Sequence, residues 1–155
     1  MIDTAYRIYL DVCCLNRPFD DQSQLRIQLE TEAILLILQQ CETNRWHLIS
    51  STAIDAEISQ IVDLARQKQV QATLNAAKIK VLENQVLHRR RSELISFGFS
   101  FYDAAHIASA ERSRADIFLS TDDRLVRRAK KRAISIYVKI ENPLTWLTAV
   151  TSSEN

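Results

Sequence analysis

The sequence contains very little glycine and proline. Its 155 residues include one Gly and two Pro. All-β folds need many tight turns, and these two residue types are among those that most often form them. The scarcity therefore argues against an all-β fold and favours long helices joined by short connections.

Disulfide-forming cysteines and long apolar runs are also missing. The three cysteines, Cys13, Cys14 and Cys41, are odd in number and two of them are adjacent, so they form no disulfide framework. Charged residues such as Asp3 and Arg7 interrupt the N-terminal segment, where a signal peptide would carry its apolar core. No stretch approaches the length of a membrane span. We expect a cytoplasmic protein with reduced thiols and no membrane partner.

The overall charge does not indicate a ligand class. Lys and Arg number 20 against 19 Asp and Glu, which gives a formal net charge of +1. A basic excess that would indicate nucleic-acid binding is absent, so the distribution of charge matters more than its sum. The length fits one domain, and we expect it over residues 1–148, with a frayed C-terminal tail over 149–155.

Hydrophobic periodicity predicts strands that alternate with helices. The expected strands cover residues 8–10, 46–50, 79–82, 116–120 and 134–138. The expected helices cover residues 22–41, 52–75, 85–97, 100–112 and 124–132. Such alternation predicts an α/β fold in which helices cover both faces of a parallel sheet.

Five acidic residues lie at informative places in this pattern. Asp11 directly follows the first expected strand, and Asp122 and Asp123 follow the fourth. Functional groups in parallel sheets collect outside the carboxyl ends of the strands. Glu57 lies about two turns into the helix after the second strand, and Asp103 lies in the first turn of its helix. Each alone could be a solvated acid or a helix cap, but together they predict one acidic pocket.

An acidic pocket of this kind requires a cation. Carboxylates about 4 Å apart repel by roughly 1 kcal/mol per pair in water, and by about 4 kcal/mol at an effective dielectric constant of 20. A divalent cation relieves this repulsion. Oxygen ligands without a convincing set of His or Cys select Mg²⁺, or Mn²⁺, over Zn²⁺.

Four segments of the chain resemble the motifs of PIN-domain nucleases, in the order that the family has them. The segments are 9–12, 50–57, 103–110 and 115–123. Each motif alone is weak, but the ordered set is specific and spans nearly the whole chain. The chain has Cys13 at a place where PIN proteins often carry Asn.

The resemblance implies a compact three-layer α/β/α sandwich with a central, mainly parallel sheet, and metal-dependent cleavage of phosphodiester bonds, usually in RNA. Carried over by position, the catalytic acids would be Asp11, Glu57, Asp103 and Asp123. Asp122 stands where many similar proteins have a polar non-acid. Either member of the Asp122–Asp123 pair could therefore join Asp11 and Asp103 as a metal ligand.

The resemblance also implies partners. Many small stand-alone PIN domains resemble the VapC-like toxin of a type II toxin–antitoxin pair, which is inhibited by a small antitoxin protein. Similar proteins often pair through helices in the N-terminal half, which makes a homodimer plausible. RNA would be the substrate.

Five further residues are candidates for substrate binding. Thr121 and Ser51 could orient water or a carboxylate, although a capping or turn role is the simpler interpretation. Arg124, Arg127 and Arg128 begin beside the expected pocket and could contact the phosphates that flank the scissile bond. The alternative for these arginines is a solvated helix face.

His106 and the overall activity each leave alternatives open. His106 lies three residues after Asp103, on the same helix face, where it could carry protons or, more simply, pack and orient a neighbour. For the whole protein, the alternatives to an RNA-cleaving enzyme are a non-cleaving PIN-fold module that binds RNA or protein, and a phosphatase-like hydrolase. Four intact acidic positions favour the enzyme.

Overall fold

The computed structural model describes residues 4–152 and contains a five-stranded sheet in which every neighbouring pair is parallel. The strand order is β3-β2-β1-β4-β5. The strands are β1 (Arg7–Leu10), β2 (His47–Ser51), β3 (Ile79–Val81), β4 (Ile117–Leu119) and β5 (Ile140–Glu141). The predicted parallel sheet is confirmed.

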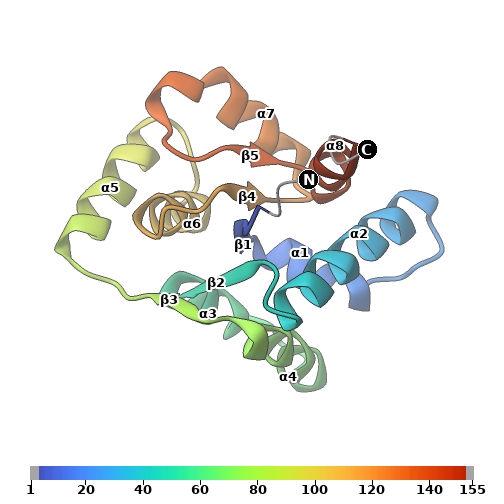
Figure 1. The fold of residues 1–155 in the computed structure, drawn as a ribbon. Helices are drawn as coiled ribbons and strands as arrows, with labels where there is room; N and C mark the ends of the chain where they lie inside the picture. The colour runs from blue at the N-terminus through green and yellow to red at the C-terminus, as the bar shows by residue number, and fades with distance from the viewer. Residues whose placement is uncertain (1–3, 153–155) are drawn as a thin grey trace.

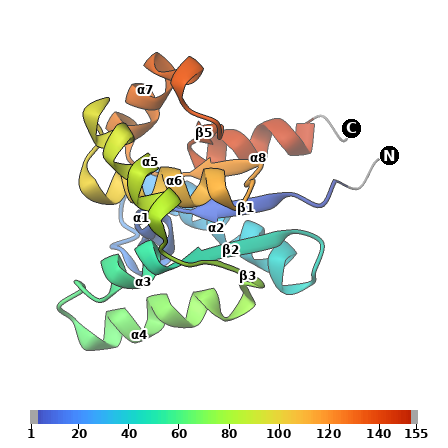
Figure 2. The same cartoon turned by 90° about the vertical axis from the view of Figure 1, so that its left-hand side faces the viewer.

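Helices cover both faces of this sheet. The helices are α1 (Val12–Asn16), α2 (Leu25–Glu42), α3 (Thr52–Ile58), α4 (Leu64–Thr73), α5 (Gln85–Ser96), α6 (Phe101–Arg112), α7 (Asp123–Lys131) and α8 (Pro143–Ser152). Short 3-10 turns occupy Arg17–Phe19, Leu74–Ala76 and Ala133–Ser135. Helices α5 and α6 lie on one side of the sheet and α2 and α8 on the other (Figures 1 and 2). The predicted three-layer α/β/α sandwich is therefore confirmed.

Strand β1 lies in the middle of the sheet and is buried on both faces. Ile8, Tyr9 and Leu10 are each 0% exposed. Leu10 is in register with Leu119 of β4, so the two strands end side by side. The residues that follow them, beginning with Asp11, therefore meet at the same edge.

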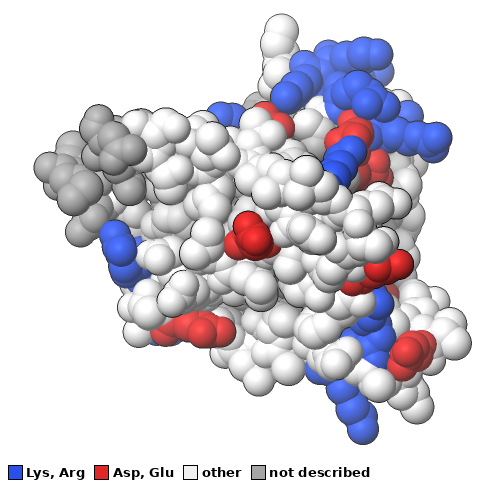
Figure 3. All heavy atoms as spheres, turned by 90° about the vertical axis from the view of Figure 1, so that its right-hand side faces the viewer, with Lys and Arg blue, Asp and Glu red and all other residues white. Residues whose placement is uncertain are grey.

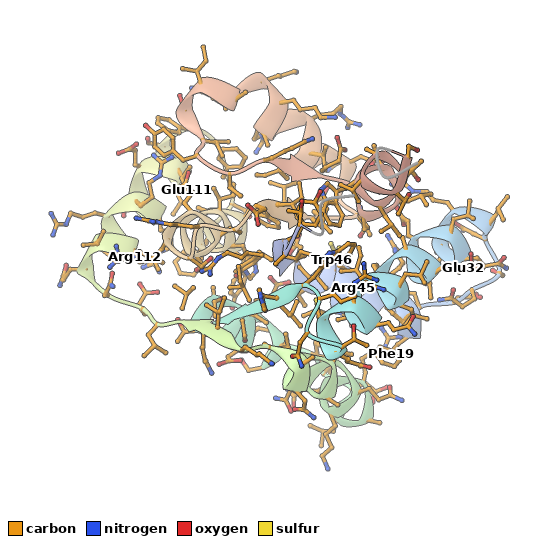
Figure 4. The ribbon with its side chains drawn as sticks, viewed as in Figure 1. Phe19, Glu32, Arg45, Trp46, Glu111 and Arg112 are labelled. Carbon is orange, nitrogen blue, oxygen red and sulfur yellow. The ribbon has the colours of Figure 1, made fainter. Side chains whose placement is uncertain are left out.

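Contacts between distant segments hold the helical layers in place. Trp46, just before β2, packs against Trp146 of α8 with ring centroids 5.4 Å apart (Figure 4). On the opposite side, Arg90 of α5 donates from Nε and Nη2 to the two carboxylate oxygens of Glu111 on α6, at 2.8 and 2.9 Å (Figure 4). Gly98 has a φ of 102° and lets the chain reverse between these two helices. The reversal brings the N-terminus of α6, with Asp103, to the carboxyl edge of the sheet.

The prediction of one continuous helix over 52–75 is wrong in one respect, because the structure has two helices there, α3 and α4. Helix α3 ends at Ile58, and α4 begins only after Asp63. The Asp63 side chain accepts hydrogen bonds from the backbone N–H groups of Ala65 and Arg66, at 2.9 and 3.2 Å. This N-terminal cap starts a new helix where apolar spacing alone suggested continuity.

The strand expected over 134–138 is also wrong. Ala133–Ser135 forms a 3-10 turn after α7, and the last strand is Ile140–Glu141. Pairing with β4 begins only where the Phe118 N–H donates to the Lys139 carbonyl, at 2.8 Å. The β-prone residues Ile134 and Ile136 thus precede the strand.

The C-terminal helix continues beyond the expected domain end at residue 148. Helix α8 begins at Pro143, a residue that suits the first turn, and runs to Ser152. The Asn142 side chain caps it by accepting from the Leu144 and Thr145 N–H groups, at 2.8 and 3.3 Å. Of the tail expected to fray, 149–152 are thus helical, and 153–155 lie outside the described residues. Among the helices of residues 4–152, none has the length and apolar character to cross a bilayer.

The segment after α7 offers a matched test of this fold. Ile136 is 8% exposed and packs in the core, whereas Ile134 is 96% exposed. We expect Ile136→Ala to lower the free energy of unfolding by about 2 kcal/mol or more, because it leaves a cavity. Ile134→Ala should change it by less than about 0.5 kcal/mol. Chemical denaturation measures both, and equal losses would contradict the described turn.

Candidate metal centre

Asp11 is a buried carboxylate held in place by three donors. It directly follows β1, is 6% exposed, and its own N–H donates to the Leu119 carbonyl at 2.9 Å. Its Oδ1 accepts from the Val12 N–H at 2.8 Å, which caps α1. Its Oδ2 accepts from the Ser120 hydroxyl at 2.8 Å and from the Cys13 thiol at 3.4 Å. Burial raises the pKa of Asp11, and the negative charge of Glu57 raises it further.

Glu57 and His106 face Asp11 from the helices α3 and α6. His106 is 0% exposed, and its Nε2 lies 2.7 Å from Glu57 Oε1 and 4.0 Å from Asp11 Oδ1. One ligand atom from each of the three residues lies within 4.8 Å of the other two. Burial alone would lower the pKa of His106, but the hydrogen bond with Glu57 and the charge of Asp11 raise it. Three elements that are distant in sequence thus supply one cluster.

Asp103 belongs to the same electrostatic environment. It lies in the first turn of α6, where the Ser100 side chain caps the helix by accepting from the Asp103 N–H at 3.2 Å. Burial raises the pKa of Asp103 from 3.8 to about 6, and the negative charges of Asp11 and Asp122 contribute. The pKa of Asp103 therefore depends on burial first and on the charges of Asp11 and Asp122 in addition.

The adjacent residues Asp122 and Asp123 have different environments. Asp122 caps α7 by accepting from the Arg124 N–H at 2.9 Å, and its charge reaches Asp103. Asp123 instead accepts from Nη2 and Nη1 of Arg26 on α2, at 2.8 and 2.9 Å, which lowers the pKa of Asp123. The Asp123 side chain is 51% exposed. The carboxylate of Asp123 is thus held by Arg26, whereas that of Asp122 caps α7 and contributes to the raised pKa of Asp103.

Of the two hydroxyl candidates from the sequence, Ser51 has a structural role. Ser51 is 0% exposed; its Oγ accepts from the Ile54 N–H at 3.0 Å, which caps α3, and lies 2.7 Å from the Tyr9 hydroxyl. It is out of reach of a substrate, and the capping interpretation is the correct one. Thr121 is 7% exposed, and its N–H donates to Cys13 Sγ at 3.4 Å.

Sequence reasoning missed Ser120, whose hydroxyl contacts Asp11. The signal was present in the chain, because Ser120 is the hydroxyl residue two positions before Asp122. The family resemblance instead directs attention to Asp123, which it assigns to the catalytic acids.

A groove of about 600 Å³, lined by four arginines and three acids, lies at the start of α7, where both Asp122 and Asp123 line it. Its lining includes Arg124 and Arg127 of α7 together with Thr121 and Asp122. Within residues 4–152, the side chains of Arg124 and Arg127 form no ion pair. Arg128, in contrast, donates to the Gly98 carbonyl. Lys and Arg gather over α7, at the top of the face in Figure 3.

Known proteins resemble this chain in structure rather than in sequence. No protein-family model and no curated protein matches the sequence. The structure is similar to a chain in the crystal structure of VapBC2 from Rickettsia felis bound to a DNA fragment from their promoter, with a TM-score of 0.57 and 12% identity. That match covers 88% of this chain and 98% of the other. The chain has a PIN-like fold.

A second structure is less similar. PAE2754 from Pyrobaculum aerophilum matches with a TM-score of 0.48 and 17% identity, over 94% of this chain and 99% of the other. The PIN-like fold therefore rests on the first match and on the observed layers and topology.

The raised pKa of Asp103 predicts a stability change in the protein without metal. Between pH 3.8 and about 6, the unfolded chain ionises Asp103 while the folded chain keeps it protonated, so stability falls as pH rises through this window. In EDTA at pH 7, Asp103→Asn should therefore raise the free energy of unfolding by about 1 to 3 kcal/mol. The gain should vanish below about pH 4.

The control for this prediction is Asp55→Asn on α3. Asp55 pairs with Lys80 at a side-chain exposure of 48%, so its replacement should change stability by less than about 1 kcal/mol. Denaturation across pH 3.5 to 8 measures both variants. An Asp103→Asn protein that is less stable than wild type at pH 7 in EDTA would contradict the described repulsion.

Proposed function

We propose that this protein is a metal-dependent endoribonuclease that hydrolyses RNA phosphodiester bonds at the carboxyl edge of its sheet. The observation that carries the proposal is the cluster of Asp11, Glu57 and His106, whose ligand atoms come from three separate segments and lie within 4.8 Å of one another. The charge of Asp11 also contributes to the raised pKa of Asp103. Bringing like charges together and partly burying them is costly, and a protein gains nothing from it unless a cation is bound. The PIN-like fold supports the same activity.

The residues at this edge fit a hard divalent cation. Asp11, Glu57, Asp103 and Asp122 would hold it, because their oxygens are the ligands that Mg²⁺ and Mn²⁺ prefer. The pKa values of Asp11 and Asp103 are both raised, in part by neighbouring carboxylates, so a positive charge at this place relieves an existing strain. When bound, such an ion lowers the pKa of a coordinated water and offsets charge on the phosphate.

The protein's own groups orient the acids and bind the substrate. Ser120 and the Val12 N–H fix the two oxygens of Asp11, which keeps this carboxylate from turning away. Arg124 and Arg127 in the adjacent groove contact the phosphates that flank the scissile bond. Such contacts supply affinity without base selectivity, since they reach only the backbone.

The proposal extends to a biological role and to partners. A small single-domain nuclease of this fold fits the toxin of a type II toxin–antitoxin pair, inhibited by a small antitoxin that covers the acidic edge. The structure that this chain resembles is that of VapBC2 bound to a DNA fragment from their promoter. Growth arrest on expression of the wild-type chain, and not of a variant with a damaged acidic site, is the corresponding test.

Asp11→Asn tests the enzymatic activity directly. The variant keeps the size of the side chain but removes the charge at the centre of the cluster. We expect cleavage of single-stranded RNA in Mg²⁺ to fall by about 100-fold or more, which corresponds to about 3 kcal/mol of lost transition-state stabilisation. EDTA should abolish cleavage by the wild type. A wild-type protein that binds RNA but does not cut it in Mg²⁺ or Mn²⁺ would show a non-cleaving module instead.

The pair Asp122→Asn and Asp123→Asn tests which neighbour serves the site. Asn caps helices about as well as Asp, so Asp122→Asn should fold normally. We expect it to reduce cleavage by about tenfold or more, since it removes one of the acids proposed to hold the ion. Asp123→Asn loses an exposed ion pair with Arg26 and should keep activity within about threefold. RNA cleavage rates at saturating Mg²⁺ decide between them, and the reverse order would restore Asp123 as the fourth acid.

A further inference from the structure

We propose that His106 is a positioning residue that donates a hydrogen bond from Nε2 to Glu57, and that the cation site consists of oxygen ligands only. His106 lies close enough to Asp11 and Glu57 to serve as a third metal ligand, so its role has to be decided from its hydrogen bonds. The part of this inference that concerns the cation rests on the proposed function. The part that concerns the imidazole does not.

Both nitrogens of the buried ring already have partners. Nδ1 lies 2.7 Å from the Tyr9 hydroxyl, and Nε2 lies 2.7 Å from Glu57 Oε1. The ring is 0% exposed. Buried polar atoms with this geometry are held firmly, because losing either partner would leave a desolvated group unpaired.

The position of the imidazole hydrogen follows from these partners. An ionised carboxylate only accepts hydrogen bonds, so Nε2 must carry a hydrogen to approach Glu57 this closely. On the opposite side, the Ile54 N–H donates to Ser51 Oγ at 3.0 Å, which leaves the Ser51 hydroxyl free to donate to Tyr9. The Tyr9 hydroxyl in turn lies 2.7 Å from Nδ1, and this contact is possible whether or not Nδ1 carries a hydrogen. A continuous chain of hydrogen bonds thus links the backbone of α3 to Glu57 through Ser51, Tyr9 and His106.

Because Nε2 carries this hydrogen, His106 is not a ligand of the proposed cation. A metal that bound Nε2 would have to displace the hydrogen and break the bond to Glu57, and Nδ1 is blocked by Tyr9. His106 instead holds Oε1 of Glu57 and leaves Oε2 available to the site. A site without imidazole favours Mg²⁺ or Mn²⁺ over Zn²⁺.

Nitrogen NMR of the wild-type protein labelled with ¹⁵N-histidine tests the assignment without an activity assay. In EDTA, His106 should show a hydrogen on Nε2, and this hydrogen should remain when Mg²⁺ is added. His47 and His88, which lie outside the cluster, are internal controls in the same spectrum. A bare Nε2 in EDTA, or loss of its hydrogen on addition of Mg²⁺, overturns the proposal even if the protein proves to be a nuclease.

Two variants of His106 provide a second readout. Gln places an amide N–H near the position of Nε2 and can still donate to Glu57, whereas the shorter Asn cannot reach it. We expect His106→Asn to weaken Mg²⁺ binding, measured by calorimetry, by 10- to 100-fold, and His106→Gln to stay within about fivefold of wild type. Equal loss in the two variants indicates a direct ligand and overturns the proposal. If neither variant folds, the wild-type spectra decide alone, and absence of RNA cleavage in Mg²⁺ with the expected spectra contradicts only the nuclease.

Discussion

The parallel pairing of β1 with β4 is the contact on which the whole site depends. Leu10 is in register with Leu119, and the Asp11 N–H donates to the Leu119 carbonyl, so the two strands end together. This brings Ser120 against the carboxylate of Asp11. A shift by one residue would turn every side chain of β1 to the opposite face and would separate the pair. The apolar residues of β1 are buried on both faces, and their burial fixes the register.

The acidic residues at the carboxyl edge of the sheet, Asp11 and Asp103, lower the stability of the folded protein. Burial and neighbouring charge raise the pKa values of Asp11 and Asp103 together, so folding without a cation requires these groups to remain close in an unfavourable environment. The core tolerates this because its strands bury large apolar side chains such as Phe118 and Ile49 completely. The repulsion is thus a local cost that the proposed cation would remove, which would link its binding to folding stability.

The sequence predicted the sheet and its layers, because these follow from strand ends and helix starts that are local patterns. The structure groups Asp11 and Glu57 with His106 in one cluster. The sequence did not distinguish Asp122 from Asp123. The difference depends on Arg26, which lies 97 residues from Asp123 and whose position only the tertiary fold determines. The strand expected over 134–138 failed for a similar reason, since β-prone residues form a strand only where a neighbouring strand is available, and β4 pairs with Ile140–Glu141.

Ser51 shows how a residue expected at the substrate can act from inside the protein. As the N-cap of α3, it determines where that helix begins and therefore where Glu57, six residues later, reaches the edge of the sheet. The same hydroxyl contacts Tyr9, which contacts His106, which contacts Glu57. Glu57 is thus constrained twice, through its backbone and through its side chain, by one buried hydroxyl. Two constraints with a common origin keep the carboxylate in place while its neighbours repel it, which is the condition that a preorganised cation site requires.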